Sequence, residues 1–274
     1  MPPVAPNRHE RNTSFSWRGA TGAGRLVTDA HARQWDDEGY FLLEGVLDPD
    51  ELERVRAAVD PFEERTTAWL RDQGGSALIA DAEAITFTTH LVTRCDVARA
   101  FAAGPVFADL CAGLVGPDVR LYWDQAVYKK PEPEREFPWH QDNGYAYVEP
   151  QQYLTCWVPL VDATVENGCP WVVPGLHRLG TLEHWWTPVG FQCVTEPEGA
   201  VPVEARAGDV VVFSSLTPHR TGPNTSGSVR KAYILQYAPD GAVALRGEEG
   251  RPEPQDDPDR QFPVVEGGRP VAAA

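Results

Sequence analysis

The chain has 274 residues, with 24 lysines and arginines against 40 aspartates and glutamates, and a formal net charge of −16. A chain of this length forms one or two domains and is long enough to bury a core. The acidic balance repels phosphate backbones and anionic lipids, so we expect neither a nucleic-acid partner nor a membrane partner. No apolar run approaches the roughly 18 residues that a membrane-spanning helix needs.

The first residues contain prolines and arginines but no apolar leader segment. The five cysteines are odd in number and show no C-x-x-C spacing, which disfavours a disulfide framework and a zinc ribbon. Both features predict a cytoplasmic protein with reduced thiols. Residues 1–27 have no hydrophobic periodicity, so we expect a disordered arm there.

Helices are predicted in the first half of the chain. Thr28 or Asp29 can cap a helix that runs to about Glu38, where Gly39 ends it, and a short strand follows at 40–43. Asp48 followed by Pro49 is typical of a helix start, and that helix is predicted to reach about residue 71. Two more helices are expected from residue 96 and over 105–114.

The pattern changes at about residue 119, where short apolar segments alternate with turn signals. These segments cover 119–127, 153–161, 170–173, 201–205, 210–213 and 229–237. Helices followed by several short strands predict an α+β fold, with a double-stranded β-helix (jelly roll) core buttressed by the N-terminal helices. Residues 240–274 are rich in acids and prolines, so we expect a flexible acidic tail.

Two histidines and one aspartate are candidate metal ligands. His140 and Asp142 are two residues apart at a strand end, so both side chains project to one face. His219 follows the strand 210–213 and can supply a third ligand. Two histidines with one carboxylate form the facial triad of non-heme Fe(II) oxygenases. The alternative is a structural hydrogen bond between His140 and Asp142.

Arg230 begins the strand 229–237, a short distance after His219. A guanidinium held on a rigid strand near an iron site is suited to binding a dicarboxylate co-substrate through two parallel hydrogen bonds. The alternative is an ordinary surface ion pair.

Several motifs together resemble one family. They are the opening stretch Asp37 to Leu47, Asp124-Gln125 with Lys129-Lys130-Pro131, Pro138-Trp139-His140-Gln141-Asp142, Glu166-Asn167-Gly168-Cys169, Val173-Pro174-Gly175-Leu176-His177-Arg178, and Pro223-Asn224-Thr225-Ser226 with Arg230. From about residue 28 to residue 238 the sequence resembles the phytanoyl-CoA dioxygenase family of Fe(II)/2-oxoglutarate-dependent oxygenases. The resemblance implies one dioxygenase domain over 28–239, flanked by the arm and the tail.

The resemblance also implies roles for individual residues. His140, Asp142 and His219 become the iron ligands and the catalytic centre. Arg230 holds the distal carboxylate of 2-oxoglutarate, and further residues help to bind this co-substrate: Thr221, Thr155, Gln125, Phe137 and Trp157.

Aromatic residues near these motifs are candidates for the substrate site: Tyr145, Tyr147, Trp185 and Trp186. They equally suit a role as loop residues packed on the barrel. His177 and His184 are rival metal ligands, and we expect His177 to be structural.

The function implied by the resemblance is oxidation by Fe(II), 2-oxoglutarate and O₂. Asp142 favours a hydroxylase, because related halogenases lack this carboxylate. We expect hydroxylation of an unactivated C–H of a small to mid-sized metabolite, with release of succinate and CO₂, by a monomer or homodimer. The alternatives are a cupin-like metal-dependent enzyme that does not use 2-oxoglutarate, and a non-catalytic jelly-roll binding protein.

Overall fold

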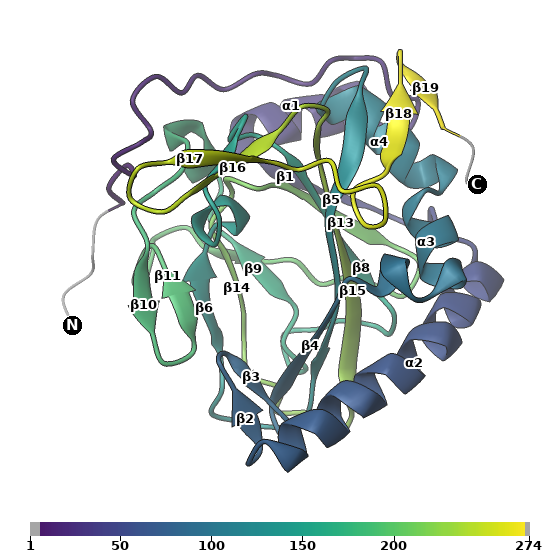
Figure 1. Cartoon of the computed structure of the whole chain (residues 1–274). Helices are drawn as coiled ribbons and strands as arrows, with labels where there is room; N and C mark the ends of the chain where they lie inside the picture. Colours follow the sequence, from purple (N-terminus) through teal and green to yellow (C-terminus); the bar gives the residue numbers. More distant parts are fainter. Residues whose placement is uncertain (1–5, 272–274) are drawn as a thin grey trace.

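A computed structural model describes residues 6–271, and two antiparallel sheets form its centre (Figure 1). The larger sheet has the strand order β1-β13-β8-β15-β5-β4-β3-β2, with β18 beside β5 and β19 beside β18. The smaller sheet has the order β12-β9-β14-β6. This arrangement confirms the expected α+β class with a jelly-roll core.

The strands of the larger sheet are β1 (Tyr40–Leu43), β2 (Ser76–Ala77), β3 (Ala80–Asp81), β4 (Ile85–Thr89), β5 (Val119–Lys129), β8 (Leu154–Pro159), β13 (Val210–Ser214), β15 (Arg230–Pro239), β18 (Pro263–Glu266) and β19 (Arg269–Pro270). Those of the smaller sheet are β6 (Phe137–His140), β9 (Pro170–Val172), β12 (Val201–Pro202) and β14 (His219–Thr221). Two ribbons complete the strands: β10 (Trp185–Thr187) with β11 (Gly190–Gln192), and β7 (Val148–Glu149) with β16 (Val243–Arg246) and β17 (Arg251–Pro254).

The helices are α1 (Asp29–Glu38), α2 (Pro49–Asp72), α3 (Asp96–Ala102) and α4 (Pro105–Leu114), with 3₁₀ turns η1 (Leu91–Thr93), η2 (Asp142–Gly144) and η3 (Leu176–Leu179). The side chain of Asp48 caps α2 by accepting hydrogen bonds from the backbone N–H groups of Asp50 and Glu51. Gly39 ends α1 in the left-handed region at φ 81°, where His177 leaves no room for a Cβ.

Strand β15 separates the two cores of the molecule. Tyr233 and Tyr237 stack on Phe101 of α3 and Phe107 of α4, in the core between the larger sheet and the helices (Figure 1). Ile234 belongs to a second core, between the two sheets. Because side chains alternate along a strand, Arg230 lies on the same inner face as Ile234.

The flexible tail expected at 240–274 is wrong for the described residues up to 271. β18 pairs with β5, and the side chains of Phe262, Val264 and Val265 are buried in the helix-side core. Strands β18 and β19 are very short, so they leave no periodicity in the sequence. The partner of β18, strand β5, lies more than a hundred residues away.

The disordered arm expected at 1–27 is also wrong for residues 6–27, whereas residues 1–5 lie outside the described part. The side chain of Asn12 is buried and donates hydrogen bonds to the carbonyls of Leu179 and Thr181. Trp17 packs against Trp35 of α1 and against His177. The partners of this segment come from distant loops, which local composition cannot reveal.

One described stretch, Asp96–Leu114, is long and apolar enough to pass a length and composition test for a membrane span. It consists of two helices, because α3 ends at Ala102 and α4 begins at Pro105. Phe101, Phe107 and Leu110 are buried in the helix-side core, which accounts for the apolar composition.

Candidate active site

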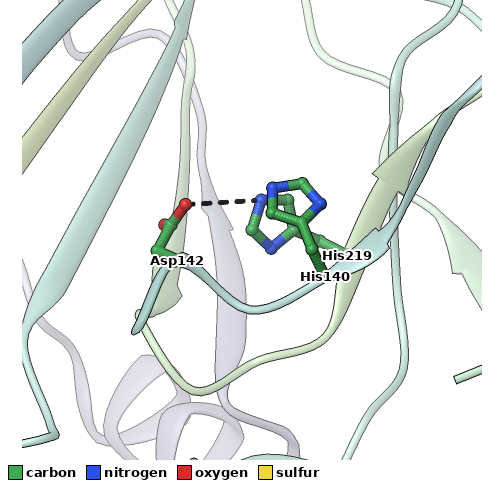
Figure 2. A group of neighbouring side chains, drawn as sticks. All are labelled: His140, Asp142 and His219. Atoms are coloured by element: carbon green, nitrogen blue, oxygen red, sulfur yellow. Dashed lines mark ion pairs between the residues drawn. The ribbon is translucent and has the colours of Figure 1, made fainter. Parts of the chain in front are cut away.

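His140, Asp142 and His219 lie together between the two sheets (Figure 2). β6 ends at His140, β14 begins at His219, and the two residues are directly opposite in the antiparallel pair. Asp142 follows on the turn η2. One ligand atom from each residue lies within 4.8 Å of the others, and the Oδ1 atom of Asp142 is 3.7 Å from Nε2 of His219. The fold therefore brings the predicted triad together.

Hydrogen bonds orient all three side chains. Nδ1 of His140 lies 2.8 Å from the carbonyl oxygen of Pro138, and Nδ1 of His219 lies 3.0 Å from that of Thr217. Because a carbonyl only accepts, Nδ1 carries the hydrogen in both rings and each Nε2 keeps its lone pair for a metal. Thr155 donates to Oδ2 of Asp142 at 2.5 Å, which leaves Oδ1 facing the histidines.

Burial of the triad disfavours a positive charge on its histidine His140. Burial, and next the neighbouring His219, hold the pKa of His140 well below its ordinary value. The ring is therefore neutral at pH 7, which is the form that coordinates a metal.

Arg230 is fully buried and lacks a carboxylate partner within residues 6–271. Its Nη1 donates to the carbonyl oxygen of Val127 at 3.2 Å, and its Nε and Nη2 have no hydrogen-bond partner. The guanidinium lies 5.2 Å from the ring centre of Trp157. Burial lowers the pKa of Arg230 to about 10, so the group remains charged at pH 7. An unpaired buried cation is costly, and this one is suited to an anion that enters the cavity.

Lys129 is a second buried cation that the sequence analysis assigned no role. It lies opposite Arg230 in the β5–β15 pair, and its Nζ donates to the side chain of Thr221 at 3.3 Å and to the carbonyl oxygen of Gly222. Burial, and next the charge of Arg230, lower the pKa of Lys129 to about 7. Side-chain alternation along β5 from Gln125 would have placed Lys129 on the inner face.

A single cavity joins the triad to Arg230. All residues expected to bind the co-substrate line it: Arg230, Thr221, Thr155, Gln125, Phe137 and Trp157. The remaining walls of the cavity were not predicted from the sequence, and they are apolar: Ile85, Phe87, Val127, Pro170, Phe213 and Ile234. Most of these residues follow the two-residue alternation of their strands, which is the signal that could have found them.

The predicted substrate residues divide into two groups. Tyr145 contacts the site, because its ring centre lies 5.4 Å from that of His140. Tyr147 does not: it is buried against His9, 4.8 Å away. Tyr147 lies between the 3₁₀ turn η2 and strand β7, and its ring packs on the N-terminal segment. Trp185 and Trp186 on β10 lie outside the residues that line the cavity.

The rival histidines lie outside the triad. His177 packs edge-on against Trp17, with Nε2 3.3 Å from the carbonyl oxygen of Asp36. His184 accepts a hydrogen bond from the backbone N–H of Gln141 at 3.0 Å, between the two ligands of β6 and η2. Both histidines therefore make structural contacts near the site and are not part of the triad.

Residues 35–232 match the family model of phytanoyl-CoA dioxygenase. The chain belongs to the phytanoyl-CoA dioxygenase family. Phytanoyl-CoA dioxygenase domain-containing protein 1 of Danio rerio is 24% identical over 260 residues, covering 77% of this chain and 89% of the relative. The methylphosphonate hydroxylase of Gimesia maris is 27% identical over 220 residues, covering 77% and 80%.

Solved structures of family-like enzymes share the fold. The non-heme alpha ketoglutarate dependent carbocyclase SnoK from nogalamycin biosynthesis superposes with a TM-score of 0.67 and 25% identity, covering 93% of this chain and 96% of SnoK. EctD from S. alaskensis, solved with 2-oxoglutarate and 5-hydroxyectoine, has a TM-score of 0.68 and 22% identity, covering 98% and 93%. These solved structures thus share a jelly-roll core with this chain.

Proposed function

We propose that this chain is an Fe(II)/2-oxoglutarate-dependent dioxygenase that hydroxylates an unactivated C–H of a small to mid-sized metabolite. The reaction balances as substrate plus 2-oxoglutarate plus O₂ giving hydroxylated substrate, succinate and CO₂. One oxygen atom enters the substrate and the other enters succinate. The proposal includes a cytoplasmic monomer or homodimer that binds no nucleic acid and no membrane.

The observation that carries the proposal is the buried guanidinium of Arg230 in the same cavity as the triad. Two of its nitrogens lack acceptors, so the cavity is electrostatically incomplete without an anion. A structural His–Asp pair in a binding protein needs no such cation. A surface ion pair, the other alternative for Arg230, is incompatible with its full burial.

The donor set fits iron. Two imidazole nitrogens and one carboxylate oxygen could hold iron and would leave other positions on the metal open for further ligands. When bound, the iron supplies the oxidising chemistry by combining O₂ with 2-oxoglutarate. The chain positions the reactants: Nε2 of His140, Nε2 of His219 and Oδ1 of Asp142 face one point, and Thr155 fixes the rotation of that carboxylate.

Arg230 lies deeper in the cavity, where Nε and Nη2 are free to donate two parallel hydrogen bonds to the distal carboxylate of 2-oxoglutarate. The ring of Trp157 covers the guanidinium and excludes water from this pair. The apolar walls of the cavity further reduce the dielectric around it.

Anaerobic addition of Fe(II) and 2-oxoglutarate tests the metal site, because chelation of both at one metal gives a weak visible absorption band. His219→Ala should abolish the anaerobic band and also the formation of succinate once O₂ is admitted, whereas the matched control His177→Ala should keep both. The opposite pattern would show that the ligand assignment is wrong. Metal binding without any 2-oxoglutarate consumption would favour the cupin-like alternative.

Product mass tests the hydroxylase assignment once a substrate is available. Hydroxylation adds one oxygen atom, whereas ring closure removes two hydrogens and epimerisation leaves the mass unchanged. The distinction matters because similar solved structures include the carbocyclase SnoK and the epimerase SnoN, each 25% identical.

A further inference from the structure

A continuous line of aromatic rings runs from the cavity to the molecular surface. Phe87 contacts Phe137 at 5.5 Å between ring centres, Phe137 stacks on Tyr145 at 6.4 Å, Tyr145 meets Phe191 edge-on at 5.3 Å, and Phe191 meets Trp186 at 5.1 Å. We call these five residues the aromatic wall. Its inner members, Phe87 and Phe137, line the cavity with the triad.

The outer end of the wall is exposed although its rings are large. Trp186 is 55% exposed and Tyr145 is 37% exposed, and both rank among the exposed large hydrophobic side chains of residues 6–271. Neighbouring apolar groups left open to water mark binding surfaces. Single exposed rings need no explanation, but these two belong to one continuous series of ring contacts, and Tyr145 also lies 5.4 Å from the ring centre of His140.

The wall is held in place without a ligand. The backbone N–H of Phe191 donates to the hydroxyl of Tyr145 at 3.3 Å, which ties the β10–β11 ribbon to the residues after the triad. Gly190 has no room for a Cβ, because that atom would lie 2.7 Å from the same hydroxyl. A surface fixed in this way loses little conformational entropy when a ligand binds.

The charges around the cavity exclude a charged substrate. Among the described residues that line it, Arg230 and Asp142 are the charged side chains. In the proposed function Arg230 holds the co-substrate and Asp142 holds the metal. The nearby ammonium of Lys129 donates to the side chain of Thr221 and to the carbonyl of Gly222. A charged group on the substrate would therefore be buried without a counter-ion.

We propose that the aromatic wall recognises a substrate with a flat, uncharged aromatic or conjugated ring system. This inference rests on the proposed function and names the substrate class of the same site. Aromatic rings pair with one another edge-on or in offset stacks, in the geometries that the wall already uses internally. Tyr145, Phe191 and Trp186 are the specificity-determining residues, and Tyr145 brings the ring system next to His140.

Two probes with one carbon skeleton test this proposal: 2-naphthol, which is flat, and decahydro-2-naphthol, which is saturated and puckered. We measure their dissociation constants by calorimetry on the anaerobic Fe(II)/2-oxoglutarate complex. We expect 2-naphthol to bind more tightly. Trp186→Ala and Phe191→Leu should each weaken 2-naphthol about two- to tenfold, the size of one aromatic contact, with little effect on the saturated probe.

Trp69→Ala is the matched control, because Trp69 on α2 is 53% exposed. Helix α2 and the β10–β11 ribbon lie on opposite sides of the molecule (Figure 1). This control variant should leave both affinities unchanged. Equal affinities for the two probes, no binding of 2-naphthol up to its solubility limit, or wall variants that bind it as the wild type does would overturn the proposed substrate class. A change in oligomeric state in Trp186→Ala with unchanged 2-naphthol affinity would also overturn it, in favour of a second copy of the chain.

The visible band of the iron and 2-oxoglutarate complex distinguishes a wrong substrate class from a wrong proposed function. A normal band with failed probe binding refutes the substrate class alone. Absence of the band in the wild-type protein refutes the proposed function and, with it, the inference.

Discussion

Replacing Arg230 tests the co-substrate anchor. The side chain is fully buried, and its free Nε and Nη2 can each form a charge-assisted hydrogen bond to a carboxylate. Removing one partner of such a buried pair costs about 2–5 kcal/mol. Arg230→Ala should therefore raise the dissociation constant for 2-oxoglutarate by roughly 30-fold or more, since each 1.4 kcal/mol is about tenfold. The assay is an anaerobic titration of 2-oxoglutarate into the Fe(II)-loaded protein, followed by the visible band.

Two further variants test whether the guanidinium of Arg230 is the cause of the lost 2-oxoglutarate affinity. Arg230→Lys should recover only part of the loss, because an ammonium cannot reproduce the two parallel hydrogen bonds of a guanidinium. Arg246→Ala removes an arginine from an exposed ion pair with Glu253 on the β16–β17 ribbon and should bind like the wild type. The affinity for Fe(II) alone should be similar in all four proteins. Equal 2-oxoglutarate affinities would refute the anchor and favour a metal site that uses no 2-oxoglutarate.

Three other changes have defined expected outcomes. The buried amide of Gln141 donates to the carbonyls of Gly180 and Leu216 and accepts from the N–H of Leu182, so Gln141→Leu leaves these three backbone groups without a partner. Calorimetry should show a melting temperature lowered by at least about 5 °C, and an unchanged melting temperature would contradict this expectation. Deletion of residues 255–274 should lower the melting temperature by a comparable amount, because it removes Phe262 and strand β18 from the helix-side core and exposes their neighbours to water. An unchanged melting temperature would show that β18 is dispensable. Because the pKa of Lys129 is lowered to about 7, its side chain loses the positive charge above that pH unless an anion binds beside it. The affinity for 2-oxoglutarate should therefore fall between pH 6.5 and 8.5 in the wild type, and fall less in Lys129→Met. Parallel pH profiles of the two proteins would refute a contribution of the Lys129 charge to 2-oxoglutarate binding.

Local signals in the sequence predicted the helices and the triad. The caps at Thr28 and Asp48 predicted the starts of α1 and α2, because capping is a short-range interaction that the sequence shows directly. The two-residue spacing of His140 and Asp142 predicted that they face one side, and the structure brings them together with His219 as a candidate metal site.

The sequence did not predict features that depend on distant partners. Strand β16 pairs with β7, strand β18 pairs with β5, and Asn12 donates to the carbonyl of Leu179, so each of these segments depends on a partner far away in the chain. Tyr147 was proposed for the substrate site only because it follows His140 and Asp142 closely, and the sequence does not show that its ring packs on the distant His9 instead. Alternation along β5 from Gln125 would have placed Lys129 on the inner face, but its position opposite Arg230 follows only from the pairing of β5 with the distant strand β15.

A crystal structure of the anaerobic complex with Fe(II) and 2-oxoglutarate tests the central claim most directly. We expect the iron to be bound by Nε2 of His140, Nε2 of His219 and a carboxylate oxygen of Asp142, with the distal carboxylate of 2-oxoglutarate on Nε and Nη2 of Arg230. Iron held by other side chains, or 2-oxoglutarate bound away from Arg230, would contradict the account.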